Sequence, residues 1–288
     1  MAEQILNGII LGTIYALLGS GLTIIYGTMR VLNFAHGEFY MLGGYAFLTL
    51  TMMLGINPFV ALPLAGLVVF LMSGIVASLI IRPLLAKPGW EFSTIAATLG
   101  LSIAMQNIAL KIWGEKFQPV TYFVDGMIEI AGLRLPYQRV LIALVAFAAV
   151  TATALLLRYS RFGRSVRATA QDAEAARVMG IPTGLISVLS FALGSSLAAI
   201  AATVLSPIYA VNPWMGVPLS LKAFAVVVMG GLGSFSGSIV AGLVLGIVEA
   251  LGVQLTSSEW REAISFAVLI AVILVRPWGL FGVKRMVK

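Results

Sequence analysis

The chain has 288 residues, of which 60% are hydrophobic and only 10% are charged, against about 25% charged residues in an ordinary soluble domain. A water-soluble fold of this length cannot cover so much apolar surface, so the composition excludes a soluble enzyme or a nucleic-acid-binding domain and indicates a polytopic membrane protein. A chain with no cysteine and a single histidine has neither disulfides nor a multi-histidine metal centre, and its net charge of +7 suits cytoplasmic loops rich in Lys and Arg.

Uncharged apolar runs of 18 residues or more are each long enough for one crossing of the bilayer. Such runs lie at residues 5–27, 39–56, 59–81, 93–110 and 140–157, and further crossings fit at about 185–206 and at 263–275 with 277–283. The first run lacks the basic start and cleavage site of a signal peptide, so it is expected to span the membrane. We expect an all-α polytopic membrane protein of 8 to 10 transmembrane helices, near nine with the N-terminus outside.

The placement of the few charges predicts the orientation of these helices. Residues 82–91, 158–177 and 276–288 carry an excess of Lys and Arg, whereas residues 111–139 carry four basic and three acidic residues. The positive-inside rule puts the first three segments in the cytoplasm and the last one outside. This alternation requires residues 219–230 to count as a short crossing, and it fails if they form a re-entrant segment.

Glycine interrupts the apolar runs in both halves of the chain. The first interruption includes Gly37, and the second includes Gly230, Gly231 and Gly233. Irregular backbone at membrane depth survives only inside protein or along a water-filled path, and paired interruptions suggest a transport pathway. The alternative is that small residues let helices pack closely, and we favour it for the spacings Gly8-x-x-x-Gly12, Gly233-x-x-x-Gly237 and Gly242-x-x-x-Gly246.

A few polar side chains fall inside the apolar runs, where an ionisable group costs at least about 2.5 kcal/mol and usually faces a polar cavity. The candidates for a translocation path are Asn33, His36, Glu38, Lys222 and Glu249. Lys222 either faces a pore or extends to an interface, and Glu249 either pairs with Lys222 or lies at the outer surface. The first three are expected to form a hydrogen-bonded cluster that fixes the turn, with a structural rather than a catalytic role.

The basic segment 158–182 contains the signals of a short helix. Asp172 is a good N-cap, Gly180 suits the C-terminal end, and Pro182 prevents continuation. Ala175, Ala176 and Met179 are expected on one face, where small residues allow another protein to approach. The alternative is a solvated connector between two spans.

At this point the residues resemble a known family. Glu174-Ala175-Ala176, three residues and then Gly180 look like the EAA loop of ABC importer permeases. From about Leu6 to Gly282 the chain resembles the LivH-like permeases of branched-chain amino acid importers. The resemblance is carried by the stretches GTIYALLGSGLTIIYGTMRVLNFAHGEFYMLGGY, LLLRYSRFGRSVRATAQDAEAARVMGI, LKAFAVVVMGGLGSFSGSIVAGLVLGIVEA and LVRPWGLFG. Residues 111–139 look less typical of the family.

The resemblance implies one transmembrane permease domain over residues 1–288, with the LivH/LivM-type fold and broken or re-entrant helices. It implies a cytoplasmic coupling loop at about 158–182, an extracytoplasmic loop at about 111–139, and residence in the bacterial inner membrane. The coupling helix would contain Asp172, Glu174, Ala175, Ala176, Met179 and Gly180.

The resemblance also implies partners. These are a LivM-like second permease subunit or a second copy of this chain, two cytoplasmic ABC ATPase subunits and a periplasmic substrate-binding protein. The chain lacks the phosphate-binding pattern G-x-x-x-x-G-K-[ST], so ATP and magnesium are expected on the partner ATPases and no cofactor or enzymatic activity on this chain.

The expected function is therefore passage of branched-chain amino acids, or of a related small polar solute, delivered by the binding protein. An ion- or proton-coupled secondary transporter acting alone is the alternative, and a passive channel is a third possibility. Family resemblance does not choose between branched-chain amino acids and urea, short amides or aromatic and dicarboxylic acids.

Overall fold

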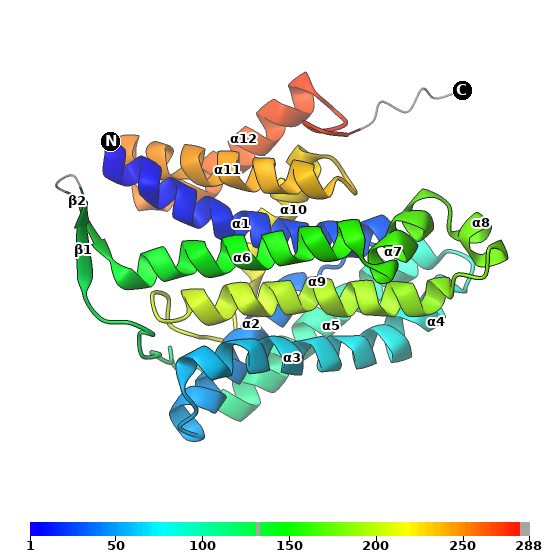
Figure 1. Ribbon diagram of the computed structural model, residues 1–288, viewed down its shortest axis with the longest axis horizontal. Helices are drawn as coiled ribbons and strands as arrows, with labels where there is room; N and C mark the ends of the chain where they lie inside the picture. Colours follow the sequence, from blue (N-terminus) through cyan, green and yellow to red (C-terminus); the bar gives the residue numbers. More distant parts are fainter. Residues whose placement is uncertain (131–132, 283–288) are drawn as a thin grey trace.

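A computed structural model describes residues 1–130 and 133–282 of the chain. The described residues form a helical bundle with one small hairpin (Figure 1). The helices are α1 (Ala2–Met29), α2 (His36–Leu48), α3 (Pro58–Val76), α4 (Arg82–Leu85), α5 (Trp90–Trp113), α6 (Tyr137–Tyr159), α7 (Arg161–Gln171), α8 (Ala173–Val178), α9 (Thr183–Leu205), α10 (Gly216–Gly230), α11 (Phe235–Leu255) and α12 (Arg261–Val275). Short π-helical segments, Thr49–Met53 and Ala77–Ile81, continue α2 and α3, and Ser258–Trp260 is a 3-10 turn.

Six helices of the described chain are long and apolar enough to cross a membrane. They are Glu3–Met29, Pro58–Leu85, Trp90–Trp113, Tyr137–Tyr159, Thr183–Leu205 and Phe235–Leu255. Three further runs expected to cross lie mainly in the shorter helices α2, α10 and α12. The predicted all-α polytopic fold is confirmed, whereas the total of 8 to 10 spans stays a prediction that requires these shorter helices to cross as well.

The charge-balanced segment 111–139 and the basic segment 158–182 lie at opposite ends of the bundle (Figure 1). The N-terminus lies at the same end as the antiparallel strands β1 (Met127–Ile130) and β2 (Leu133–Pro136), which we call the hairpin end. Helices α7 and α8 lie at the other end, called the α8 end. This arrangement agrees with the predicted separation of residues 111–139 from residues 158–182. The strands themselves were not expected from the sequence.

Helix α1 lies in the middle of the bundle, and glycines allow it to approach α11 closely. A Cβ atom on Gly12 would meet the backbone of Leu243, and one on Gly246 would meet Gly12 itself. Gly8 and Gly242 likewise face backbone of the opposite helix. The close-packing interpretation of the Gly8–Gly12 and Gly242–Gly246 spacings is therefore confirmed.

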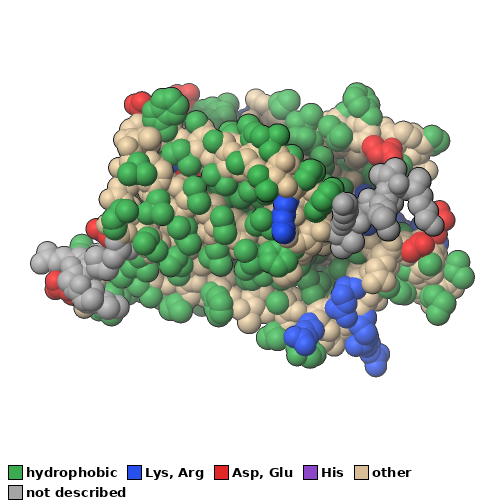
Figure 2. Space-filling model, turned by 90° about the horizontal axis from the view of Figure 1, so that it is seen from above, with side chains coloured by type: hydrophobic (Ala, Val, Ile, Leu, Met, Phe, Trp, Pro, Cys, Tyr) green, Lys and Arg blue, Asp and Glu red, His purple; other side chains and the backbone are tan. Residues whose placement is uncertain are grey.

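Large apolar side chains cover the outside of the bundle. Leu71 and Ile75 on α3, Ile103 on α5 and Phe147 on α6 are all more than half exposed. Figure 2 shows one face on which hydrophobic side chains predominate, while most of the charged side chains gather towards its ends. Such a surface is stable only in contact with lipid or with other transmembrane helices.

Candidate functional site

The first predicted interruption separates α1 from α2 and lies partly inside the bundle. The side-chain oxygen of Asn33 accepts a hydrogen bond from the Ala35 amide at 3.1 Å, which holds the turn. Helix α2 then begins beside the middle of α1, because His36 Nε2 lies 3.2 Å from the carbonyl oxygen of Leu18. Residues 30–35 thus return from the end of α1 to about half its length before the next helix starts.

Helix α10 begins next to the start of α2. The amide of Gly37 donates to Ser220 Oγ at 2.7 Å, and a Cβ atom on either Gly37 or Gly216 would meet the carbonyl oxygen of the other. Two helix N-termini, each with a partial positive charge, therefore meet inside the bundle. The sequence prediction placed the short crossing at residues 219–230 and did not identify this second helix start at Gly216.

The predicted second interruption at Gly230, Gly231 and Gly233 lies instead in the turn between α10 and α11, towards the α8 end (Figure 1). Gly231 and Gly233 have φ angles of 100° and 86°, which favour glycine. Gly230 packs directly against Gly237. Gly233 has open space around its Cα, so its conformation and not close packing explains this glycine, contrary to our interpretation of the Gly233–Gly237 spacing.

The expected cluster of Asn33, His36 and Glu38 does not form, because the three side chains reach different elements. Glu38 is fully buried, and its Oε1 accepts hydrogen bonds from Ser102 at 3.0 Å and from Gln106 at 2.8 Å, both on α5. His36 bonds to α1 and Asn33 to its own turn. Glu38 and His36 thus fix the start of α2 between α1 and α5.

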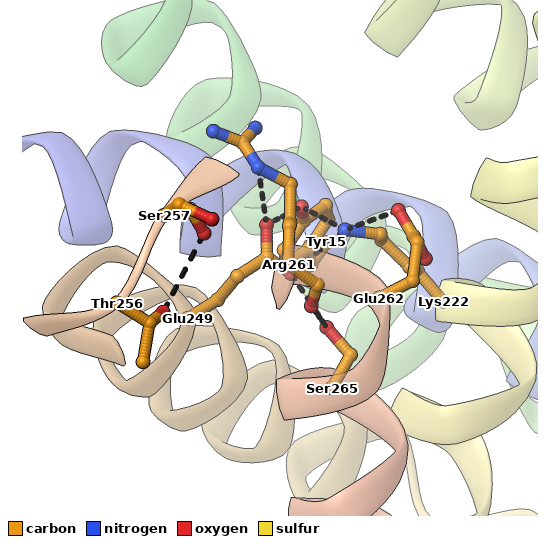
Figure 3. A network of polar contacts seen from close by, with 8 residues as sticks. All are labelled: Tyr15, Lys222, Glu249, Thr256, Ser257, Arg261, Glu262 and Ser265. Carbon is orange, nitrogen blue, oxygen red and sulfur yellow. Dashed lines mark hydrogen bonds and ion pairs between the residues drawn. The ribbon is translucent and has the colours of Figure 1, made fainter. Parts of the chain in front are cut away.

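Lys222 and Glu249 form a buried ion pair, as one of the sequence interpretations predicts (Figure 3). Lys222 Nζ lies 2.7 Å from Glu249 Oε2 and 3.3 Å from Glu262 Oε1, and it donates to the Tyr15 hydroxyl at 3.1 Å. Lys222 is 4% exposed and Glu249 is fully buried. The ammonium therefore faces the interior of the bundle, and the interpretation of Lys222 as an interface residue is wrong.

Glu249 has further partners that connect four helices. Its carboxylate accepts hydrogen bonds from Tyr15 on α1 at 2.9 Å and from Ser265 on α12 at 2.7 Å, and Arg261 Nε lies 3.7 Å away. We call Tyr15, Lys222, Glu249, Arg261, Glu262 and Ser265 the polar network. Its two cations and two anions balance, which lowers the cost of burying them.

Sequence reasoning found only the two central members of the polar network. Tyr15 and Ser265 carry no charge and give no signal in an apolar run. Arg261 and Glu262 precede the last apolar run, and their opposite charges were the available signal. The described residues contain no group of three His, Cys, Asp or Glu side chains that fits a metal ion.

The expected short helix in the basic segment is α8. Asp172 Oδ1 accepts hydrogen bonds from the amides of Glu174 and Ala175, both at 2.9 Å. Gly180 has a φ angle of 82° and donates to the carbonyl of Arg177 at 3.0 Å, which ends the helix. The predicted N-cap and C-terminal residue are therefore confirmed as the ends of this helix.

The faces of α8 differ from the expectation. Ala176 is buried against the bundle, whereas Ala175 is exposed and Met179 is 81% exposed. The neighbouring Val178 is 87% exposed. Consecutive residues of an α-helix differ by about 100° in direction, so Ala176 packs inward while the adjacent Ala175 points away. The exposed face thus consists of Ala175, Val178 and Met179, and Ala176 anchors it.

Arg30 connects the region of α8 to the first interruption. It caps α1 in the left-handed conformation, with a φ angle of 56°, which is unusual for a residue other than glycine. Its guanidinium donates to the carbonyl of Ala170 near the end of α7 at 3.0 Å. Asp172, the N-cap of α8, follows two residues later. One side chain thus bridges the loop before α2 and the segment that carries α8.

Known proteins share both the sequence pattern and the fold of this chain. The family described as the permease component of branched-chain amino acid transport systems matches residues 4–273. The high-affinity branched-chain amino acid permease LivH of Salmonella typhimurium is 34% identical over 97% of this chain and 95% of its own length. BraD of Pseudomonas aeruginosa is 35% identical over the same shares. The solved structure of PsaBC from Streptococcus pneumoniae in complex with Fab covers 97% of this chain and 93% of its own, with a TM-score of 0.50 and 13% identity, and it shows likeness of fold alone.

Proposed function

The chain belongs to the family of permease components of branched-chain amino acid transport systems, and we propose that it is the membrane-spanning subunit of an ATP-binding-cassette importer. The solute is a branched-chain amino acid or a related small polar molecule. The observation that carries the proposal is the length of the match, which extends over residues 4–273 and includes every residue of the polar network. A transporter acting alone has no comparable support.

Helix α8 is the proposed docking element for the ATPase. It lies at the α8 end, outside the main bundle (Figure 1), and its exposed face of Ala175, Val178 and Met179 suits a groove on another protein. Asp172 and Gly180 fix its two ends, and Glu174 lies in its first turn. Displacement of α8 by the ATPase is proposed to tip the bundle between outward-facing and inward-facing states.

The partners follow from this role. A LivM-like permease subunit or a second copy of this chain completes the transmembrane part, and two cytoplasmic ATPases bind ATP and magnesium. A periplasmic binding protein delivers the solute at the hairpin end, so the complex resides in the bacterial inner membrane. This chain has no cofactor of its own and supplies the passage, while its partners perform the hydrolysis.

The proposed path runs past the polar network and the meeting point of α2 and α10. Lys222 and Glu249 supply charged groups at depth, and Asn33, His36 and Glu38 hold the start of α2. Helix starts inside a transmembrane bundle are typical positions for solute sites.

Uptake by the reconstituted complex tests the proposal. The complex of this chain with its co-purified subunits is placed in liposomes, and uptake of labelled L-leucine is measured with binding protein outside and ATP on the ATPase side. Vanadate should abolish uptake, and an ionophore that collapses the proton gradient should leave it unchanged. Uptake that survives vanadate and stops with the ionophore would overturn the proposal.

A further inference from the structure

Two adjoining cavities follow α1 from the hairpin end to the polar network. The outer cavity, of about 150 Å³, is lined by Asn7 on α1 and Arg139 on α6, near the starts of these helices. The inner cavity, of about 220 Å³, is lined by Tyr15 and Lys222. The residues that line both cavities, and therefore mark where they adjoin, are Leu11, Leu205, Tyr209 and Arg261.

The inner cavity is lined by charged groups of both signs that can form further hydrogen bonds. Lys222 already contacts three oxygens of the polar network. Arg261 meets Glu249 only through Nε, at 3.7 Å, and the two terminal nitrogens of its guanidinium point away from Glu249 (Figure 3). Glu262 contacts Lys222 through Oε1 at 3.3 Å, and its side chain is 48% exposed. The Arg261 guanidinium, which also interacts with the Tyr209 hydroxyl, and the Glu262 carboxylate are thus only partly engaged beside a buried ion pair, with side chains 31% and 48% exposed.

The rest of the inner cavity is mostly apolar. Its wall includes Leu11, Leu205, Met215, Pro218 and Leu219, together with the rings of three tyrosines and the amide of Asn212. An apolar protein cavity of about 150 Å³ already holds a benzene molecule, so 220 Å³ is enough for a small branched side chain. The cavity therefore combines a mostly apolar wall with Arg261 and Glu262, while its third charged group, Lys222, is already paired with two carboxylates.

We infer that the inner cavity binds the zwitterion of an aliphatic amino acid, with its carboxylate on Arg261 and its ammonium on Glu262. A guanidinium matches a carboxylate with two parallel hydrogen bonds. A ligand with only one charge leaves the opposite side chain unpaired, so it binds less well. The Lys222–Glu249 pair holds Glu262 and Arg261 at the edges of the site. The inference deepens the proposed function and rests on it for the choice of ligand.

Binding to the purified complex, without its binding protein, tests the inference. Isothermal titration compares L-leucine with 4-methylpentanoate, which lacks the ammonium, and 3-methylbutylamine, which lacks the carboxylate. Leucine should bind about tenfold or more tightly than either analogue, because each analogue leaves one charged side chain without its hydrogen bonds.

Two variants should separate the two charges. Arg261→Gln should weaken leucine and 4-methylpentanoate about tenfold while leaving 3-methylbutylamine unchanged. Glu262→Gln should weaken leucine and 3-methylbutylamine and leave 4-methylpentanoate unchanged. Arg276→Gln, just beyond the other end of α12, and Glu259→Gln, in the turn before it, line neither cavity and serve as matched controls. Both should bind all three ligands as the unmodified complex does.

The pattern across ligands distinguishes the site from a structural effect, because an unfolded or distorted variant loses all three ligands together. Equal losses, unchanged binding in both variants, or no leucine binding by a complex that imports leucine would each overturn the inference while the proposed function stands. A complex that imports no small polar solute at the expense of ATP contradicts the proposed function, and the leucine titration still decides whether the cavity binds the zwitterion.

Discussion

At the scale of single residues, the Lys222–Glu249 pair is the buried electrostatic contact whose disruption is expected to destabilise the bundle most. Both side chains are buried, and their mutual distance of 2.7 Å is that of a charge-assisted hydrogen bond. Removing one partner of such a pair costs about 3–5 kcal/mol because the other charge stays behind, whereas removing both together is often nearly neutral. The pair thus stabilises the contact of α10 with α11 only as long as it is complete.

Replacement of Lys222 by methionine should therefore impair uptake and lower the melting temperature of the purified complex. The double variant Lys222→Met with Glu249→Gln should recover much of the melting temperature but not uptake, because the neutral pair no longer positions Arg261 and Glu262. Thermal unfolding and leucine uptake, measured on both variants, check this. Normal uptake by Lys222→Met would remove Lys222 from the path.

Sequence reasoning recognised this pair because charges are rare in the apolar runs and because an unpaired charge in a membrane is costly. It did not find Tyr15 or Ser265, since a hydroxyl in an apolar run carries no comparable penalty. It was wrong to expect a hydrogen-bonded cluster of Asn33, His36 and Glu38, because these residues are close in sequence but bond to different elements. Spacing along the chain does not tell which neighbouring helix each side chain meets.

At the scale of elements, α8 is a short helix whose two ends are fixed and whose middle presents an apolar face. The N-cap, the terminal Gly180 and the following Pro182 were all predictable, because caps depend on local chemistry. The inward orientation of Ala176 depends on packing against the bundle, and local sequence does not reveal it. The start of α10 at Gly216 was missed for the same reason, since the contact with Gly37 joins residues far apart in the chain.

Bulky substitution on the exposed face of α8 should uncouple the ATPase. Ala175→Trp is expected to abolish stimulated ATP hydrolysis and uptake without lowering the melting temperature, because Ala175 is exposed. Gly180→Pro should have the same functional effect, since proline does not adopt a φ angle of 82°. Ala152→Trp, at an exposed alanine of α6, is the control. Full uptake by Ala175→Trp contradicts the docking role of α8.

Arg30 gives a second prediction at this scale. Arg30→Gly preserves the left-handed backbone and removes only the guanidinium that contacts Ala170. The variant should still assemble and hydrolyse ATP, but leucine uptake per ATP hydrolysed should fall several-fold because α8 is no longer tied to the segment before α2. Parallel assays of hydrolysis and uptake measure this ratio, and an unchanged ratio shows that Arg30 only caps α1.

The close approach of α2 and α10 predicts a sharp difference between two glycines. Gly216→Ala places a methyl group against the carbonyl of Gly37 and should separate the two helix starts, with a lower melting temperature and little uptake. Gly27→Ala lies in α1 with open space around it, and it should stabilise the helix by up to ~1 kcal/mol. Thermal unfolding of both variants in the same detergent makes the comparison.

At the scale of the whole molecule, an uneven distribution of few charges gives the bundle a direction. Basic residues gather in α7 and α8, whereas residues 111–139 are nearly balanced, and the two regions lie at opposite ends (Figure 1). Composition and charge were sufficient to predict this polarity. The exact set of crossing helices was not predictable, because α2, α10 and α12 are shorter than a full span and their place depends on tertiary contacts.

The chain contains no cysteine, which makes its orientation directly measurable. Thr121→Cys lies near the hairpin end and Gln171→Cys at the α8 end, and both positions are exposed. In intact spheroplasts a membrane-impermeant maleimide should label only the first variant, and in inverted vesicles only the second. Labelling of both after addition of detergent is the control. The reverse pattern would contradict the positive-inside assignment.

The long reach of the polar network has a consequence for how the protein is made. Tyr15 and Glu249 are 234 residues apart, yet they share a hydrogen bond, and Ser265 lies further on still. During synthesis, Lys222 is made before its carboxylate partners on α11 and α12. The glycine face of α1 is likewise made long before α11, against which it packs. A chain that stops before α11 lacks Glu249 and Glu262, so the Lys222 ammonium has no carboxylate partner, and an unpaired charge at membrane depth is costly. The charges of the polar network are therefore balanced only after α11 and α12 have joined α1 and α10.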